Sequence, residues 1–324
     1  MRRISESASM IDITLQNFEA DLIADSMKQP VLLDIWAPWC GPCRTLGPLL
    51  EKLETAYAGR FKLAKLNSDD QPEIAGQLSQ AFGVRSIPFC VLFDKGQPVD
   101  GFVGALPEAQ VRAFLDRHVP TAEAMQAEAQ TEAAEELVAE GDTDAALARL
   151  QQAVAIDPAN DAARYDYVKL LLERGEVAKA RQAFEPVAGK VAIDARLDAV
   201  GRWLAACEAA PMARSADALA AAIAANRRDF DARFELAQTH FAAGRFTQAM
   251  DELLEIVMRD KAWNDELARK TYVAILELMS KPLAKAGAPE AAKGALELTG
   301  KAAAAPAADP VVDQYRRKLS MALF

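Results

Sequence analysis

The sequence has few of the features that membrane-spanning and secreted proteins need. Its 324 residues contain no apolar run near the ~20 residues that span a bilayer. The start, MRRISESASMIDIT, has two arginines but no apolar stretch after them, so we expect no signal peptide. Four cysteines in the whole chain are too few for a secreted disulfide scaffold. We expect a cytoplasmic protein that does not act at a membrane.

Basic residues are also in the minority. There are 37 Lys and Arg against 47 Asp and Glu, a net charge of −10, which disfavours nucleic acid or an anionic membrane as the main partner. A hydrophobic content of 51% with 26% charged residues is typical of a folded globular protein. At roughly 150 residues per domain, the length predicts two domains, and the charge fits partners that are proteins.

Residues 1–120 alternate the patterns of strands and helices. Residues 31–36 are a nearly continuous apolar run, typical of a central strand buried on both faces, and the turn at residues 94–98 predicts a hairpin. We predict strands at residues 31–36, 61–66, 89–93 and 99–103, a short additional strand at 11–15, and helices at 18–27, 40–58, 73–82 and 107–119. This order implies an α/β domain in which helices cover both faces of a mixed sheet.

After Pro120 the pattern becomes helical and alanine-rich, which predicts an all-α domain at residues 121–324. Gly141, Gly175 and Gly244 lie 34 and 69 positions apart, about one and two 34-residue periods, and an alanine follows each glycine by five positions. In a helix–turn–helix repeat, the glycine would make the turn and the small alanine would let the helices approach closely. Period and residues resemble tetratricopeptide repeats; an ordinary alanine-rich helical bundle is the alternative.

The C-terminal segment is expected to form one more helix. Residues 300–310 (GKAAAAPAADP) suggest a loose connector, and residues 311–324 have helical spacing. In one interpretation this helix packs on the preceding repeats through Val311, Val312, Tyr315, Leu319 and Leu323. In the other it binds a partner protein, and the sequence favours neither.

The residues with the clearest chemistry form a Trp-Cys-Gly-Pro-Cys motif at positions 39–43. It directly follows the apolar strand and opens a helix, so Cys40 falls at a helix N-terminus, where free N–H groups and the helix dipole favour a thiolate. Cys43 lies one turn along and can reach back to expel a mixed disulfide. Gly41 and Pro42 keep that turn tight and leave an incoming polypeptide close access. We predict a thiol–disulfide exchange site with Cys40 attacking and Cys43 resolving.

A zinc site is the alternative for a C-x-x-C pair. A structural zinc ion needs four ligands, usually from a second such pair or from paired histidines. The other candidates, Cys90, Cys207, His118 and His240, are isolated from one another in the sequence, so we expect no metal. Cys90 is expected to be a small buried side chain, with an accessory redox thiol as the alternative, and Cys207 is expected to fill the helical core.

Over most of its length the N-terminal half resembles thioredoxin. The resemblance is carried by residues 31–43, Lys65-Leu66-Asn67, Ile87-Pro88 and Val103-Gly104-Ala105. It implies that Asp34 is the buried carboxylate that handles the proton of Cys43, with Lys65 beside it. An ordinary strand-edge carboxylate is the alternative for Asp34, although a charge in so apolar a run is costly without a role. A solvated surface lysine explains Lys65 equally well.

The same resemblance implies a surface that binds the substrate. Pro88 would be a cis-proline facing the two sulfurs, and Ile87, Pro88 and Gly104 would pair with a substrate strand. A trans proline on an edge strand is the alternative for Pro88. Trp36 and Trp39 belong partly to the core, and Trp39 either stays there or lines the substrate groove.

The whole arrangement resembles the chaperedoxins (YbbN/CnoX-type proteins), in which a thioredoxin domain precedes degenerate tetratricopeptide-type repeats. Residues 96–102 (GQPVDGF) and 315–319 (YRRKL) add to the resemblance. It implies a holdase that protects client cysteines through mixed disulfides and passes clients to the GroEL and DnaK folding machines. Whether thioredoxin reductase recharges the cysteine pair stays open.

The sequence leaves three functional hypotheses. The leading one is an ATP-independent redox chaperone that needs no cofactor beyond the Cys40–Cys43 disulfide. The second is a non-catalytic binding scaffold or co-chaperone whose thioredoxin domain serves only as an interaction module. The third is a plain thioredoxin whose repeats select one dedicated substrate.

Overall fold

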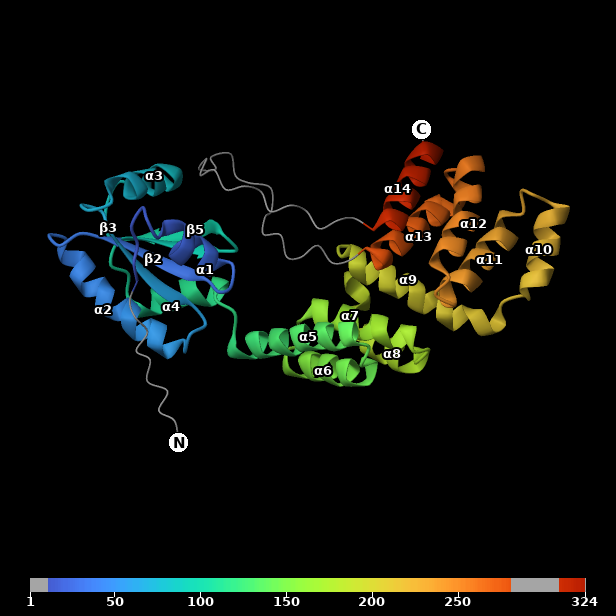
Figure 1. Cartoon of the computed structure of the whole chain (residues 1–324), viewed down its shortest axis with the longest axis horizontal. Helices are drawn as coiled ribbons and strands as arrows, with labels where there is room; N and C mark the ends of the chain where they lie inside the picture. The colour runs from blue at the N-terminus through green and yellow to red at the C-terminus, as the bar shows by residue number, and fades with distance from the viewer. Residues whose placement is uncertain (1–10, 281–308, 324) are drawn as a thin grey trace. The chain divides into compact units, whose positions relative to one another are not determined.

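The computed structural model describes residues 11–280 and 309–323. This part of the chain divides into two compact units, with the division between Met125 and Gln126. The first unit is α/β and the second is helical, as the sequence predicts (Figure 1). None of the helices in these two ranges has both the length and the apolar composition that crossing a membrane takes. Most of the connector predicted at residues 300–310 lies outside the described residues.

The first unit is built on a five-stranded mixed sheet in the order β1-β3-β2-β4-β5. The strands are β1 (Ile11–Asp12), β2 (Val31–Trp36), β3 (Lys62–Asn67), β4 (Phe89–Asp94) and β5 (Gln97–Val103). β2 runs parallel to β3 and antiparallel to β4, and β5 forms a hairpin with β4. β2 therefore occupies the centre of the sheet, the place that its apolar run predicts.

Helices cover both faces of this sheet. They are η1 (Phe18–Ile23), α1 (Ala24–Ser26), α2 (Gly41–Ala56), α3 (Pro72–Phe82) and α4 (Glu108–His118). Successive residues of a strand point to opposite faces. Val31, Leu33 and Ile35 therefore share a core with η1 and α3, whereas Leu32 shares a second core with α2 and α4. Asp34 follows Leu32 by two positions, so it faces the α2 side.

The structure corrects some of the predicted boundaries. The strand expected at residues 11–15 ends at Asp12. The helix expected from Cys40 begins at Gly41, because Cys40 has an extended backbone (φ −79°, ψ 104°) and is the N-cap. The hairpin turn expected at residues 94–98 contains only Lys95 and Gly96, whose φ angles are 52° and 77°. Positive φ at both central residues is what a two-residue type I′ turn requires.

The second unit consists of helices that pack in antiparallel pairs. They are α5 (Ala122–Glu140), α6 (Thr143–Ile156), α7 (Asp161–Glu173), α8 (Val177–Phe184), η2 (Glu185–Lys190), α9 (Ala195–Ala209), η3 (Ala210–Met212), α10 (Ala216–Ala225), α11 (Phe230–Ala242), α12 (Phe246–Arg259), α13 (Trp263–Met279) and α14 (Pro310–Leu323). Gly141, Gly175 and Gly244 follow α5, α7 and α11 with φ angles of 86°, 73° and 69°, the left-handed conformation that ends helices. The alanine five positions after each glycine is fully buried, so the predicted helix–turn–helix units are confirmed.

The connection between α9 and α10 lies at the position where a glycine is missing between Gly175 and Gly244. The residue 34 positions after Gly175 is Ala209, the last residue of α9. Instead of a glycine turn, the 3-10 helix η3 follows, with Pro211 inside it. The chain therefore makes no glycine turn at this period, and the buried Leu219 of α10 packs against Ala232 and Leu236 of α11.

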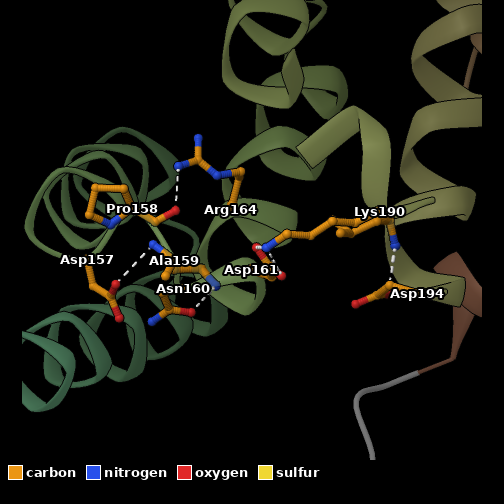
Figure 2. A network of polar contacts seen from close by, with 10 residues as sticks. Asp157, Pro158, Ala159, Asn160, Asp161, Arg164, Lys190 and Asp194 are labelled. Carbon is orange, nitrogen blue, oxygen red and sulfur yellow. Dashed lines mark hydrogen bonds and ion pairs between the residues drawn. The ribbon is translucent and has the colours of Figure 1, made fainter. Parts of the chain in front are cut away.

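The corner between α6 and α7 is fixed by side chains that bind the backbone (Figure 2). Asn160 caps α7, since its Oδ1 accepts from the Ala163 amide over 2.9 Å. The buried Arg164 donates to the Pro158 carbonyl over 3.1 Å and to the Ala183 carbonyl over 3.0 Å. One arginine thereby joins the corner before α7 to the end of α8, the helix that follows α7 through the Gly175 turn.

The last helix, α14, packs on the repeats. Val312, Tyr315 and Leu319 are buried in the same core as α12 and α13, and the Tyr272 hydroxyl donates to the Tyr315 carbonyl over 2.8 Å. Val311 was expected in this core but is exposed. Packing therefore accounts for one face of α14, and a docking role for the other stays a prediction.

Candidate active site

The two cysteines of the motif lie where the central strand is followed by a helix. Cys40 is the N-cap of α2, and Cys43 lies in the first turn of that helix. Their sulfurs form a disulfide, and their Cα atoms are 5.4 Å apart. The two sulfurs predicted to attack and to resolve are thus within covalent reach of each other.

The start of α2 directs a backbone N–H group at Cys40. The Cys43 amide donates to Cys40 Sγ over 3.2 Å. Unpaired N–H groups and the helix dipole favour a negative charge at a helix N-terminus. Once the disulfide is reduced, the same amide is in place to stabilise a thiolate on Cys40, which is the form of cysteine that attacks disulfides.

Both cysteines are more buried than the predicted site suggests. Each is 4% exposed. The side chains that pack around them are Trp36, Ala37 and Ile87. The exposed residues of the motif are Trp39 and, between the two cysteines, Gly41 and Pro42. In the disulfide form, Gly41 and Pro42 are thus more accessible than either sulfur.

Asp34 lies in one row of the sheet with Lys65 and Cys90. The strand register sets Asp34 opposite Lys65 of β3 and opposite Cys90 of β4. Asp34 is 1% exposed, and the Cys90 sulfur is 3.7 Å from Asp34 Oδ1. Lys65 is beside Asp34, but its Nζ lies 2.7 Å from Oε1 of Glu51 on α2. Lys65 is thus half of an ion pair, not a freely solvated lysine.

The surroundings of Asp34 change how readily it ionises. Burial raises the pKa of Asp34 from 3.8 to about 6, and the Glu51 charge adds to the rise. The charge of Lys65 and the hydrogen bond from Cys90 act in the opposite direction, because both favour the carboxylate. A carboxyl group that titrates near 6 can accept and release a proton close to neutral pH. The structure therefore supports a buried carboxylate over a strand-edge one.

Replacing Asp34 by asparagine is expected to stabilise the oxidised protein at neutral pH. Between its unfolded pKa of 3.8 and its folded pKa of about 6, the folded protein binds more protons than the unfolded one, so stability falls as the pH rises through this window. Asparagine removes the buried charge and should add roughly 2–3 kcal/mol to the free energy of unfolding above pH 7. Urea unfolding followed through NMR signals of β2 measures the gain. It should vanish below about pH 4, and an equal gain at low pH would contradict the explanation.

The residues predicted to bind substrate lie next to the cysteine pair. The Ile87–Pro88 peptide bond is cis, and Ile87 packs against the cysteines. The Gly104 amide donates to the Pro88 carbonyl over 2.8 Å. Gly104 has a φ of 87°, in the left-handed region that favours glycine. Ile87 thus lies against the cysteines and Pro88 is joined to Gly104 by a backbone hydrogen bond, and the pairing of these residues with a substrate strand stays a prediction.

Trp39 lies outside the core. Trp39 is 69% exposed, and its indole Nε1 donates to Asp69 Oδ2 over 3.0 Å. Asp69 was not singled out in the sequence. The one local signal is Asn67 at the end of β3, whose Oδ1 accepts from the Asp69 amide over 3.1 Å, an Asx-type turn. The core interpretation of Trp39 is wrong, whereas Trp36 is half-buried against the cysteines.

The other thiols and histidines do not assemble into a metal site. Among residues 11–280 and 309–323, no group of three or more His, Cys, Asp or Glu could hold a metal ion. Cys90 is fully buried in the core shared with α2 and α4, which argues against an accessory redox thiol. Cys207 packs at the edge of the repeat core. His118 pairs with Asp100 over 2.7 Å.

Both units match families of known proteins. A thioredoxin family model matches residues 9–117, and two tetratricopeptide-repeat models match residues 137–200 and 209–287. Thioredoxin 1 of Synechococcus elongatus is 39% identical over 116 residues, which are 36% of this chain and 100% of that protein. Thioredoxin 2 of Chlorobaculum tepidum is 42% identical over 113 residues (35% and 98%). The thioredoxin of Haemophilus influenzae is 40% identical over 112 residues (35% and 99%). Each relative matches about a third of this chain.

Proposed function

The chain belongs to the thioredoxin family, and on that premise we propose that it is a redox chaperone whose Cys40–Cys43 pair exchanges disulfides with client proteins. The observation that carries the proposal is a disulfide at the N-terminus of α2 on a chain whose second unit is made of tetratricopeptide repeats. No cofactor beyond this disulfide enters the proposed reaction.

The exchange begins with the reduced pair. The Cys40 thiolate attacks one sulfur of a client disulfide, so a bond from Cys40 to the client forms as the client's own S–S bond breaks. The displaced client sulfur leaves as a thiolate and takes a proton from water. The support for Cys40 as the attacking sulfur is its place at the N-cap and the Cys43 amide that points at it.

Cys43 completes the reaction. Its thiol gives a proton to Asp34 and attacks Cys40 Sγ, so the Cys40–Cys43 disulfide forms while the bond to the client breaks. The second client sulfur leaves as a thiolate. The client gains two electrons, and the cysteine pair loses two. A buried carboxyl on the α2 side of the sheet, with its pKa raised by burial to about 6, supports the choice of Asp34 as the proton acceptor.

The repeats supply the binding half of the function. An array of helix pairs presents an extended surface that suits a peptide or a partner helix, and a client held there has a high effective concentration near Cys40. We propose that GroEL or DnaK receives clients through the repeats or α14, and that thioredoxin reductase reduces the pair. We also propose that the protein works in the cytoplasm, where reducing conditions would keep Cys40 in the thiol form that attacks.

A non-catalytic scaffold is the second candidate. The observation that favours it is the burial of both cysteines, each 4% exposed, because an attacking thiol needs access. In that function the thioredoxin unit would only bind proteins. Replacing Cys40 and Cys43 distinguishes the two candidate functions.

Loss of both sulfurs is expected to remove the protection of client cysteines. A client that is unfolded and treated with an oxidant should keep its thiols recoverable in the presence of the wild-type protein. With the Cys40→Ser, Cys43→Ser double variant, recovery should fall to the level seen without the protein, because no mixed disulfide can form. Counting client thiols by mass spectrometry after alkylation gives the result.

The matched control is Cys207→Ser, which removes one thiol outside the site and should protect like the wild type. Client binding by the double variant, measured by light scattering during aggregation, should stay within about twofold of the wild type, since the repeats are unchanged. Full protection of client thiols by the double variant would establish the scaffold instead.

A further inference from the structure

Cys90 has a contact that the exchange reaction leaves unused. It lies in β4 directly opposite Asp34 of β2, and its sulfur is 3.7 Å from Asp34 Oδ1. Cys90 is 0% exposed and Asp34 is 1% exposed. A thiol and a carboxylate therefore meet in a part of the sheet that water does not reach.

Several charged or titratable groups face Asp34. β3 contributes Lys65, α2 contributes Glu51, and β4 contributes Cys90. The ammonium of Lys65 is paired with Glu51 over 2.7 Å, yet it lowers the pKa of Asp34 more than Cys90 does. Cys90 donates a hydrogen bond directly to the Asp34 carboxylate.

The thiol stays protonated in this place. Burial, together with the neighbouring carboxylate, raises the pKa of Cys90 well above its ordinary value of 9.0. A protonated thiol is a weak donor, and a donor to a buried carboxylate stabilises the ionised form more than the neutral acid. An apolar side chain of the same size would leave that carboxylate without this donor.

We propose that Cys90 is a positioning residue for the exchange reaction, whose S–H group holds the Asp34 carboxylate in place and favours its ionised form. The inference rests on the proposed function, in which Asp34 accepts the proton of Cys43. Without the thiol, Asp34 keeps its proton to higher pH. Release of that proton, which readies Asp34 for the next exchange, then also requires a higher pH.

The direct test is the titration of Asp34 in the full-length oxidised protein, followed by the ¹³C NMR shift of its carboxyl group. Cys90→Val and Cys90→Ala both remove the donor. Each should move the midpoint of Asp34 upward by about 0.5–1 pH unit. Cys90→Ser keeps an O–H donor and should titrate close to the wild type. Cys207→Val is the matched control, because it changes a cysteine outside the site, and it should leave the midpoint unchanged.

The second measurement is the pH dependence of insulin reduction. The pH of half-maximal rate on the acidic side of this profile should move upward with Cys90→Val. The shift should disappear when Cys90→Val is combined with Asp34→Asn. A purely structural role for Cys90 would lower the rate without moving this midpoint.

The inference fails if Cys90→Val and Cys90→Ala titrate Asp34 at the wild-type pH, or if the shift of the rate profile persists without Asp34. Cys90→Ala adds no bulk to the core, so it provides the measurement if valine disturbs the fold. The NMR titration needs no turnover, so it tests the Asp34–Cys90 contact even in a protein that is inactive. A protein that reduces no disulfide would refute the proposed function, and the titration would still decide whether Cys90 sets the pKa of Asp34.

Discussion

Reduction of insulin by this protein is expected to fall to the background rate of dithiothreitol alone when Cys40 is replaced by serine. A serine hydroxyl is not ionised near neutral pH, so residue 40 could no longer attack a disulfide sulfur. Serine is a favoured N-cap residue, so α2 should keep its start. We expect a loss of at least about 10³-fold in the catalysed rate, measured as the turbidity of the precipitating insulin B chain.

Cys207→Ser should reduce insulin at the wild-type rate, because Cys207 packs in the repeat unit. Alkylation adds an independent check: at neutral pH, iodoacetamide should react with Cys40 of the reduced protein faster than with free cysteine, since helix N-termini favour thiolates. Insulin reduction that survives Cys40→Ser would remove this residue from its role as the attacking sulfur.

Replacing Cys43 by serine is expected to increase the amount of client that stays covalently bound to the protein. Cys40 can still attack, but nothing can expel the bound client, so the mixed disulfide persists. Covalent complexes should be at least about tenfold more abundant than with the wild type. Non-reducing gels of the purified variant mixed with a disulfide-containing client show them as bands that dithiothreitol removes.

The Cys40→Ser, Cys43→Ser double variant is the control for trapping. It retains Cys90, which is fully buried, and Cys207, whose thiol pKa burial raises to about 11. Neither is suited to attack a disulfide, so no complexes should form. Complexes in the double variant would mean that a thiol outside the motif does the chemistry.

The centre of the site could be predicted because its signals are local. A buried strand, a tight turn and a helix start follow one another between Val31 and Cys43, and each has a pattern that the sequence displays. Asp34 stands out because a charge interrupts an apolar run. These features depend on near neighbours in the chain, so they could be inferred before the fold was known.

The side-chain partners around the site could not be predicted in the same way. Lys65 pairs with Glu51 and Trp39 with Asp69, across 14 and 30 positions. Each pairing depends on how a helix or loop is placed over the sheet. No periodicity in the sequence reports that placement, and the Cys90–Asp34 contact likewise needs the strand register.

The repeats show the same limit. Glycine turns gave a visible period at Gly141, Gly175 and Gly244, because a left-handed φ selects glycine. At Ala209 the chain leaves α9 through a 3-10 helix, which makes no such demand. The position one period after Gly175 therefore shows no glycine signal in the sequence.

The cover over the disulfide has a consequence for which reductants can use this protein. With 4% of each cysteine exposed, glutathione meets little accessible sulfur, and as a tripeptide it offers only a short chain to the residues beside the pair. If Ile87, Pro88 and Gly104 bind a substrate chain as predicted, a longer protein segment gains contacts there that glutathione lacks. The disulfide should thus exchange more slowly with glutathione than with a protein that binds beside it, whereas the dithiol dithiothreitol still reduces it in the insulin assay.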